Sequence, residues 1–151
     1  MAYWLFKTEP DEFSIDDLAA LYGAAEPWNG IRNYQARNIL RDHVKLGDEA
    51  FIYHSSCKLV GIAGTATITR AAYADPDQFD PGNKYFDSKA TKEQPRWFCV
   101  DVVYKAKFSR LIPLAELKQQ TQLENMVLRK QGRLSVQPVT KHEWQLIHKL
   151  P

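Results

Sequence analysis

The spacing of apolar and polar residues changes several times along the chain, which indicates a mixture of short strands and short helices. Residues 3–7 form an aromatic and apolar run that predicts a buried first strand. Residues 49–54 and 61–70, the second rich in Thr and Ile, predict a hairpin. Residues 97–104 predict the next strand, and residues 108–111 predict a further short one.

Helices are predicted where a capping residue precedes an apolar repeat. Ser14 followed by Asp17, and Thr140 followed by Glu143, have the spacing of a capping box, and Asn33 is suited to cap another helix. The predicted helices span residues 15–21, 34–41, 114–128 and the segment after residue 140. The elements alternate too irregularly for a doubly wound parallel sheet. The predicted fold class is α+β, a strongly bent mixed β-barrel with helices packed outside it.

The size and composition fit one domain, which we expect to span residues 1–151 and to act as a monomer. Of these residues 44% are hydrophobic and 25% are charged. No apolar run reaches the ~18 residues of a membrane span, and no basic leader precedes the first strand. A cytoplasmic protein without a membrane partner is expected, or a nuclear one if the source is eukaryotic. Cys57 and Cys99 are therefore expected to be reduced thiols.

The net charge of +2 argues against a protein that coats nucleic acid by charge alone. The two halves of the chain differ, however. Residues 1–75 hold 7 Lys and Arg against 10 Asp and Glu, whereas residues 76–151 hold 13 against 8. A partly basic face and a scatter of solvated surface charges both agree with these counts.

Pro27 and Gly30 predict a turn around Trp28. The segment WNGIRNYQARN at residues 28–38 combines side chains that an ordinary helix entry does not need. Trp28 offers a flat stacking face, Asn33 offers an amide that can read a base edge, and the guanidinium groups of Arg32 and Arg37 are suited to phosphate. This combination is typical of nucleic-acid recognition.

Four other segments accompany it in a specific order and spacing: YWLFKTEP at 3–10, SIDDL at 14–18, YHSS at 53–56 and RLSVQP at 133–138. Together the five segments closely resemble the EVE family of the PUA-like superfamily, and the resemblance runs from Tyr3 to about Ile147. EVE domains are similar in fold to YTH, ASCH and PUA domains and are regarded as readers of modified bases in DNA or RNA. The resemblance thus implies a PUA-like fold and a base-binding pocket.

We therefore predict a non-enzymatic nucleic-acid-binding module that accepts a flipped-out or single-stranded modified base, such as a modified cytosine or adenine, of DNA or RNA. Trp28 would stack on the base, polar groups would read its edge, and arginines would hold phosphates. No cofactor is expected. The residues expected at the site are Lys7, Thr8, Ser14, Trp28, Asn29, Arg32, Asn33, Arg37, Tyr53, His54, Ser55, Trp97 and Ser135.

Each of these residue types also has a structural explanation. Trp28 and Trp97 are candidates for the core, and Ser14 and Asn33 are candidates for helix caps. The arginines, which include Arg41 one turn after Arg37, are candidates for ion pairs with Asp42 or Glu49. The cations of the loop at 84–96 either embrace a strand or face solvent.

Signals for catalysis and for metal binding are weak. His54 and Cys57 have a spacing that occurs in zinc sites, but Cys99 is the only other thiol, so no metal is expected. No third group that would orient a Cys-His pair can be named. Two alternatives to a modified-base-binding module remain: a small hydrolase or nuclease that uses His54, and a protein-interaction scaffold.

Overall fold

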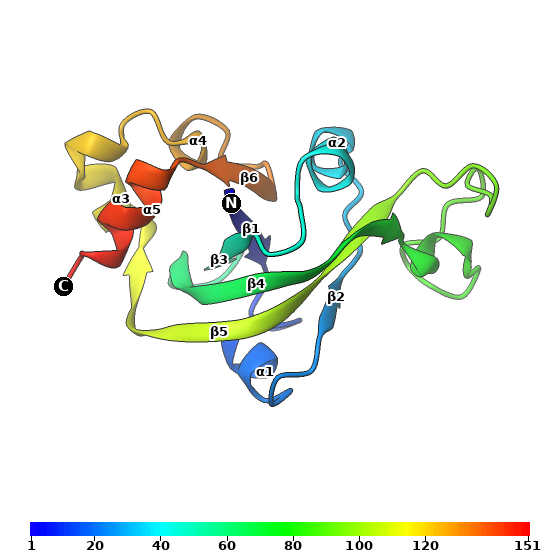
Figure 1. Cartoon of the computed structure of the whole chain (residues 1–151), viewed down its shortest axis with the longest axis horizontal. Coiled ribbons are helices and arrows are strands. Elements are labelled where there is room, and N and C mark those ends of the chain that lie inside the picture. Colours follow the sequence, from blue (N-terminus) through cyan, green and yellow to red (C-terminus); the bar gives the residue numbers. More distant parts are fainter.

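A parallel pair of central strands organises the fold. In the computed structural model, which describes residues 1–151, these two strands are β1 and β3. The other pairings are antiparallel, and the six-stranded sheet has the order β2-β5-β4-β3-β1-β6 (Figure 1). The strands are β1 (Tyr3–Thr8), β2 (Glu26–Trp28), β3 (Glu49–His54), β4 (Gly61–Ala74), β5 (Phe98–Pro113) and β6 (Val136–Val139).

Five α-helices and two 3-10 turns connect the strands. Ser14 and Thr140 form the two predicted capping boxes, and the side chain of Asn33 accepts a hydrogen bond from the backbone N–H of Ala36, as a cap does. None of the helices has both the length and the apolar character that a membrane span requires. The helical elements are α1 (Ile15–Ala19), α2 (Tyr34–Asp42), η1 (Pro76–Phe79), α3 (Leu114–Gln119), η2 (Thr121–Leu123), α4 (Val127–Lys130) and α5 (Lys141–His148).

Both faces of the sheet are covered, because successive side chains of a strand point to opposite faces. In β1, Trp4 and Phe6 join a core cluster with residues of α1 and α2, whereas Leu5 joins a second cluster with residues of α3, α4 and α5. In β3, Ile52 belongs to the first cluster and Phe51 to the second. The strands of the centre are therefore buried on both sides, and the polar residues at their ends are left to form a site.

The α+β class and the mixed sheet are confirmed, but the predicted barrel is wrong because the sheet is open. The edge strands β2 and β6 each pair with one neighbour only, and they do not pair with each other. β2 has three residues and β6 has four. Such short edges offer few free backbone groups for pairing with another chain.

Three local predictions also need correction. Residues 108–111 are not a separate strand, because β5 continues through them and pairs with β4 across several register shifts. The helix predicted at 114–128 is interrupted where Gln120 is extended, with φ −84° and ψ 108°. Trp28 ends a strand rather than occupying a turn, since it pairs with Val100 of β5.

Gly64 allows β4 to bend closely over its neighbours. It lies next to a register shift between β4 and β5. A Cβ atom at this position would meet the backbone oxygen of Ala106 at 2.3 Å and the side chain of Ile15 at 3.0 Å. The oxygen belongs to a paired strand, so it cannot move aside without disturbing the sheet.

Gly64→Ala should therefore lower the free energy of unfolding by about 1–3 kcal/mol, as overpacking does in a rigid interior. Urea denaturation of both proteins measures the difference. Gly82→Ala is the matched control, because a Cβ there meets only a side-chain oxygen of Asp80, at 3.5 Å. Equal stability of the two variants would contradict the close approach.

Candidate functional site

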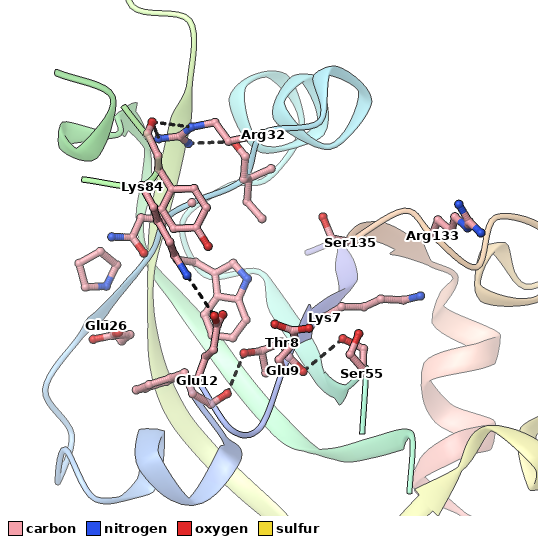
Figure 2. A pocket seen from close by; sticks show the side chains of 18 of the residues that line it. Lys7, Thr8, Glu9, Glu12, Glu26, Arg32, Ser55, Lys84, Arg133 and Ser135 are labelled. Atoms are coloured by element: carbon pink, nitrogen blue, oxygen red, sulfur yellow. Dashed lines mark hydrogen bonds and ion pairs between the residues drawn. The ribbon is translucent and has the colours of Figure 1, made fainter. Parts of the chain in front are cut away.

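A cavity of about 790 Å³ lies where four segments distant in sequence meet (Figure 2). They are the end of β1 with the loop after it, the segment from β2 to Arg32, the loop after β3, and the turn before β6. The insertion between β4 and β5 adds Lys84 and Tyr85. The volume is in the range of pockets that hold small molecules.

Aromatic rings form part of the cavity wall. Trp28 is only 6% exposed, because its ring packs against two phenylalanine rings. The centroid of the Trp28 ring is 5.8 Å from that of Phe6 and 6.3 Å from that of Phe13, which it meets edge-on. Tyr85 lies against Gly30, where a Cβ would meet the Tyr85 ring at 2.9 Å. Gly30 has a φ of +79°, a conformation that also favours glycine. Trp28 is thus both a core residue and a wall of the cavity, rather than the freely presented platform that the sequence suggested.

A fully buried carboxylate holds this wall in place. Asp75 accepts hydrogen bonds from the backbone N–H groups of Gly30 and Asp77, at 2.9 and 2.8 Å, and from the guanidinium of Arg32 at 3.0 Å. Arg32 also donates two hydrogen bonds to the backbone oxygen of Tyr85, at 3.1 and 2.9 Å. Most donors of Arg32 are therefore occupied inside the protein, which argues against a phosphate contact.

Charges of both signs surround the opening of the cavity. Lys84 forms an ion pair with Glu12 at 3.0 Å, so the insertion is tied to the loop after β1 (Figure 2). Arg133 is exposed and has no carboxylate partner. Burial lowers the pKa of Lys7, whose ammonium donates to the backbone oxygen of Gly132. Of the cations at the mouth, Arg133 is therefore the one that is free to meet a phosphate.

Several polar atoms of the cavity have no partner within the protein. The Ser135 hydroxyl is one, and the side-chain oxygen of Asn29 is another, since only the Asn29 nitrogen is used, toward Asp77 at 2.9 Å. Glu9 and Glu26 line the cavity without an ion-pair partner. Burial, with help from Asp101, raises the pKa of Glu26. The cavity is therefore rich in hydrogen-bond acceptors.

Seven of the thirteen residues expected from the sequence line this cavity. Their backbones come together because β1 and β3 end at the same edge of the sheet and β6 pairs beside β1. The backbone N–H of Lys7, for example, donates to the backbone oxygen of Ser135 at 2.9 Å. The seven are Lys7, Thr8, Trp28, Asn29, Arg32, Ser55 and Ser135.

The other six lie outside it, each for a physical reason. Ser14 and Asn33 use their side-chain oxygens as helix caps. Tyr53 is 3% exposed and belongs to the second core cluster. His54 accepts a hydrogen bond from the backbone N–H of Ile15 at 3.1 Å and lines a smaller groove beside α1.

Arg37 and Trp97 are the remaining two of the six, and they lie close together, because the guanidinium carbon of Arg37 is 5.9 Å from the centroid of the Trp97 ring. Arg37 donates to the backbone oxygen of Arg96 and to Asn38. Trp97 is 6% exposed, and its indole N–H donates to Asp87 at 2.8 Å. The Arg41 candidate is engaged with Asp42 at 2.8 Å, as the ion-pair explanation expects.

Sequence reasoning missed several residues that line the cavity. Tyr85 is one of several aromatic residues in the loop at 73–96, and no signal in the sequence places that loop against residue 30. Phe13 resembled any other core aromatic. The carboxylates carried no signal at all, because isolated Glu residues are common on surfaces. The missed residues include Glu9, Glu12, Phe13, Glu26, Tyr85 and Arg133.

The side chains that the sequence raised for catalysis or metal binding are His54, Cys57 and Cys99. No group of three or more His, Cys, Asp or Glu side chains is arranged to hold a metal ion. Burial lowers the pKa of His54 and raises that of Cys99 to about 12, so the thiol of Cys99 stays protonated and unreactive at neutral pH. Cys57 and Cys99 are both free thiols.

Known proteins are similar to this chain in sequence and in fold over nearly the whole length of the chain. Human thymocyte nuclear protein 1 is 44% identical over 97% of the chain and 72% of its own length. A crystal structure of a Pseudomonas putida protein has 53% identity, a TM-score of 0.92 and coverage of 97% of both chains. The structure of human THYN1 in complex with DNA that contains 5-methylcytosine has 42% identity, a TM-score of 0.93 and coverage of 100% of both chains.

The model of the EVE domain family matches residues 2–150, which include every segment that builds the cavity. The match covers nearly the whole chain, and it agrees with the resemblance drawn from the five sequence segments. The protein belongs to the EVE domain family.

Proposed function

We propose that this protein is a reader of modified bases, which binds DNA by accepting one modified base in the cavity bounded by Trp28 and Tyr85. The observation that carries the proposal is the combination of aromatic walls, unpartnered acceptors and cations, among them the unpaired Arg133, at one opening. A base taken out of a stack needs these three features: a surface for its face, partners for its edge and charges for its phosphates. The DNA complex of the THYN1 relative supports the same assignment.

The acceptors favour a base with an exocyclic amino group. Carboxylates accept hydrogen bonds from the N4 amino group of cytosine, and adenine carries a comparable amino group. Glu26, Glu9 and the Asn29 oxygen are acceptors that line the cavity. A methyl mark would contact the apolar wall, and such a contact changes affinity by about 1–3 kcal/mol. We therefore propose modified cytosine or adenine as the ligand class, with 5-methylcytosine as the first to test.

The reader role is favoured over the two alternatives. A hydrolase that uses His54 would need this histidine at the cavity, whereas it lies beside α1 and holds the helix N-terminus. A scaffold would not need unpartnered acceptors inside a cavity. We accordingly propose a non-enzymatic module that consists of one PUA-like domain, acts as a monomer and has no metal. Its place would be the cytoplasm, or the nucleus in a eukaryote, and RNA remains an alternative partner to DNA.

Replacing Tyr85 separates base binding from folding. Tyr85→Leu keeps apolar bulk but removes the stacking surface, so affinity for a 5-methylcytosine oligonucleotide should fall by about tenfold to a hundredfold, the worth of one stacked base. The free energy of unfolding should change little. Fluorescence anisotropy with methylated and unmethylated strands measures the first quantity, and urea denaturation measures the second.

Two companion variants complete this test. Trp28→Ala should lose stability by about 3–5 kcal/mol, because Trp28 is almost fully buried. Tyr22→Leu is the control, since Tyr22 is 94% exposed and lies outside the cavity. Undiminished binding by Tyr85→Leu would remove Tyr85 from the site, and equal affinity of the wild type for methylated and unmethylated strands would refute the reader role.

The two arginines of the cavity should respond differently to removal of their charge. Arg133→Gln should weaken binding to methylated and unmethylated strands alike and lower the slope of log affinity against log salt by about 0.7–0.9. Its stability should remain that of the wild type. Arg32→Gln should instead destabilise the protein, because it leaves Asp75 buried without its cation. Salt titrations and denaturation curves give both readouts, and a reversed pattern would show that Arg32 is the phosphate contact.

A further inference from the structure

Tyr34 is a large aromatic residue that lies on the surface outside the cavity. It is the first residue of α2, it is 47% exposed, and it does not line the cavity. One face of its ring stacks on Trp97, with 4.8 Å between the ring centroids and 29° between the planes. Trp97 is itself 6% exposed, so it serves as a rigid support beneath Tyr34.

Tyr34 stays 47% exposed although Trp97 covers one face of its ring, so the opposite face is accessible to solvent at least in part. The guanidinium carbon of Arg37 is 4.8 Å from the Tyr34 centroid and 5.9 Å from the Trp97 centroid. A group on the outer face of Tyr34 would be much farther from Trp97, so Arg37 lies beside the two rings. Arg96 hydrogen-bonds to the Tyr34 hydroxyl, and its guanidinium carbon is 5.8 Å from the ring centroid, so Arg96 lies toward the hydroxyl end of the ring. Arg37 therefore does not cover the outer face, and Arg96 approaches it only from the hydroxyl end.

These two cations carry positive charge to the edge of the exposed ring. Arg37 has no carboxylate partner, since its donors go to a backbone oxygen and to the neutral side chain of Asn38. Arg96 is paired only loosely, at 3.4 Å from Asp87. An open aromatic face flanked by guanidinium groups is suited to a base with its phosphates.

A series of three rings and one guanidinium group connects this surface to the cavity: Tyr34, Trp97, Arg32 and Tyr85. The guanidinium carbon of Arg32 lies 5.4 Å from the Trp97 ring and 5.3 Å from the ring of Tyr85, which lines the cavity. Arg32 is fixed in this place by Asp75. Direct contacts through Trp97 and Arg32 therefore join Tyr34 to the cavity wall.

We propose that the outer face of Tyr34 is a second base-stacking site, which takes an unpaired nucleotide that neighbours the base in the cavity on the same strand, with Arg37 and Arg96 at its phosphates. This inference rests on the proposed function and extends it from one nucleotide to a short stretch of strand. The role of the site is affinity without sequence preference, because every base has a face that can stack.

The experiment compares a long ligand with a short one. Tyr34→Leu should bind a 5-methylcytosine oligonucleotide at least about tenfold more weakly than the wild type, whereas the free 5-methylcytosine nucleoside, titrated by NMR, should bind both proteins equally. Tyr34→Phe, which loses the hydroxyl bond to Arg96 but keeps the ring, should restore most of the affinity. Tyr22→Leu is again the control for an exposed tyrosine.

Oligonucleotides with one abasic position then locate the stacked nucleotide. Wild type and Tyr34→Leu should become equal in affinity when the base at one particular neighbouring position is missing, and should differ at every other position. A Tyr34→Leu variant that binds the long strand like the wild type would overturn the proposal. An equal loss for the nucleoside would also overturn it, because Tyr34 would then act through the cavity wall.

Failure of the proposed function would look different from either result. In that case the wild type itself would show no preference for the methylated nucleoside or strand, whatever residue stands at position 34. Strand binding that depends on Tyr34 but is indifferent to methylation would leave the second stacking site in place and reject the reader role alone.

Discussion

The buried carboxylate of Asp75 is the interaction on which the site depends. An unpaired charge in the interior costs several kcal/mol, so Asp75 is stable only while Arg32 and the backbone N–H groups of Gly30 and Asp77 remain in place. Those partners lie in two segments that are more than 40 residues apart in the chain. The same contacts fix the insertion that carries Tyr85 and set the positions of the rings on both sides of Arg32.

The sheet forms one side of the cavity, and the insertion between β4 and β5 forms the other. The parallel pairing of β1 and β3 brings Thr8 and Ser55 to one edge, where the backbone N–H of Ser55 donates to the oxygen of Thr8 at 2.9 Å. The insertion closes the other side, and the ion pair between Lys84 and Glu12 bridges the two. Both groups of this pair are exposed, so it contributes little stability, and an approaching phosphate can take over Lys84 at small cost.

What the sequence predicted correctly was local in origin. The capping boxes at Ser14 and Thr140 and the hairpin of β3 and β4 follow from neighbouring residues. The open sheet and the place of Tyr85 depend on pairing between distant segments, for which a single sequence holds no signal. The side chains of Ser14 and Asn33 were ambiguous for another reason, because capping a helix and reading a base require the same oxygen atoms.

The meeting of β1 with β6 has a consequence for synthesis of the protein. Lys7 and Ser135 are joined by a backbone hydrogen bond, although nearly the whole chain separates them. Ribosomes release the N-terminal part first, and β6 is among the last elements to emerge. The edge of the cavity that contains Ser135 therefore forms only after β6 has left the ribosome and has paired with β1. A nascent copy that still lacks β6 thus lacks the finished cavity.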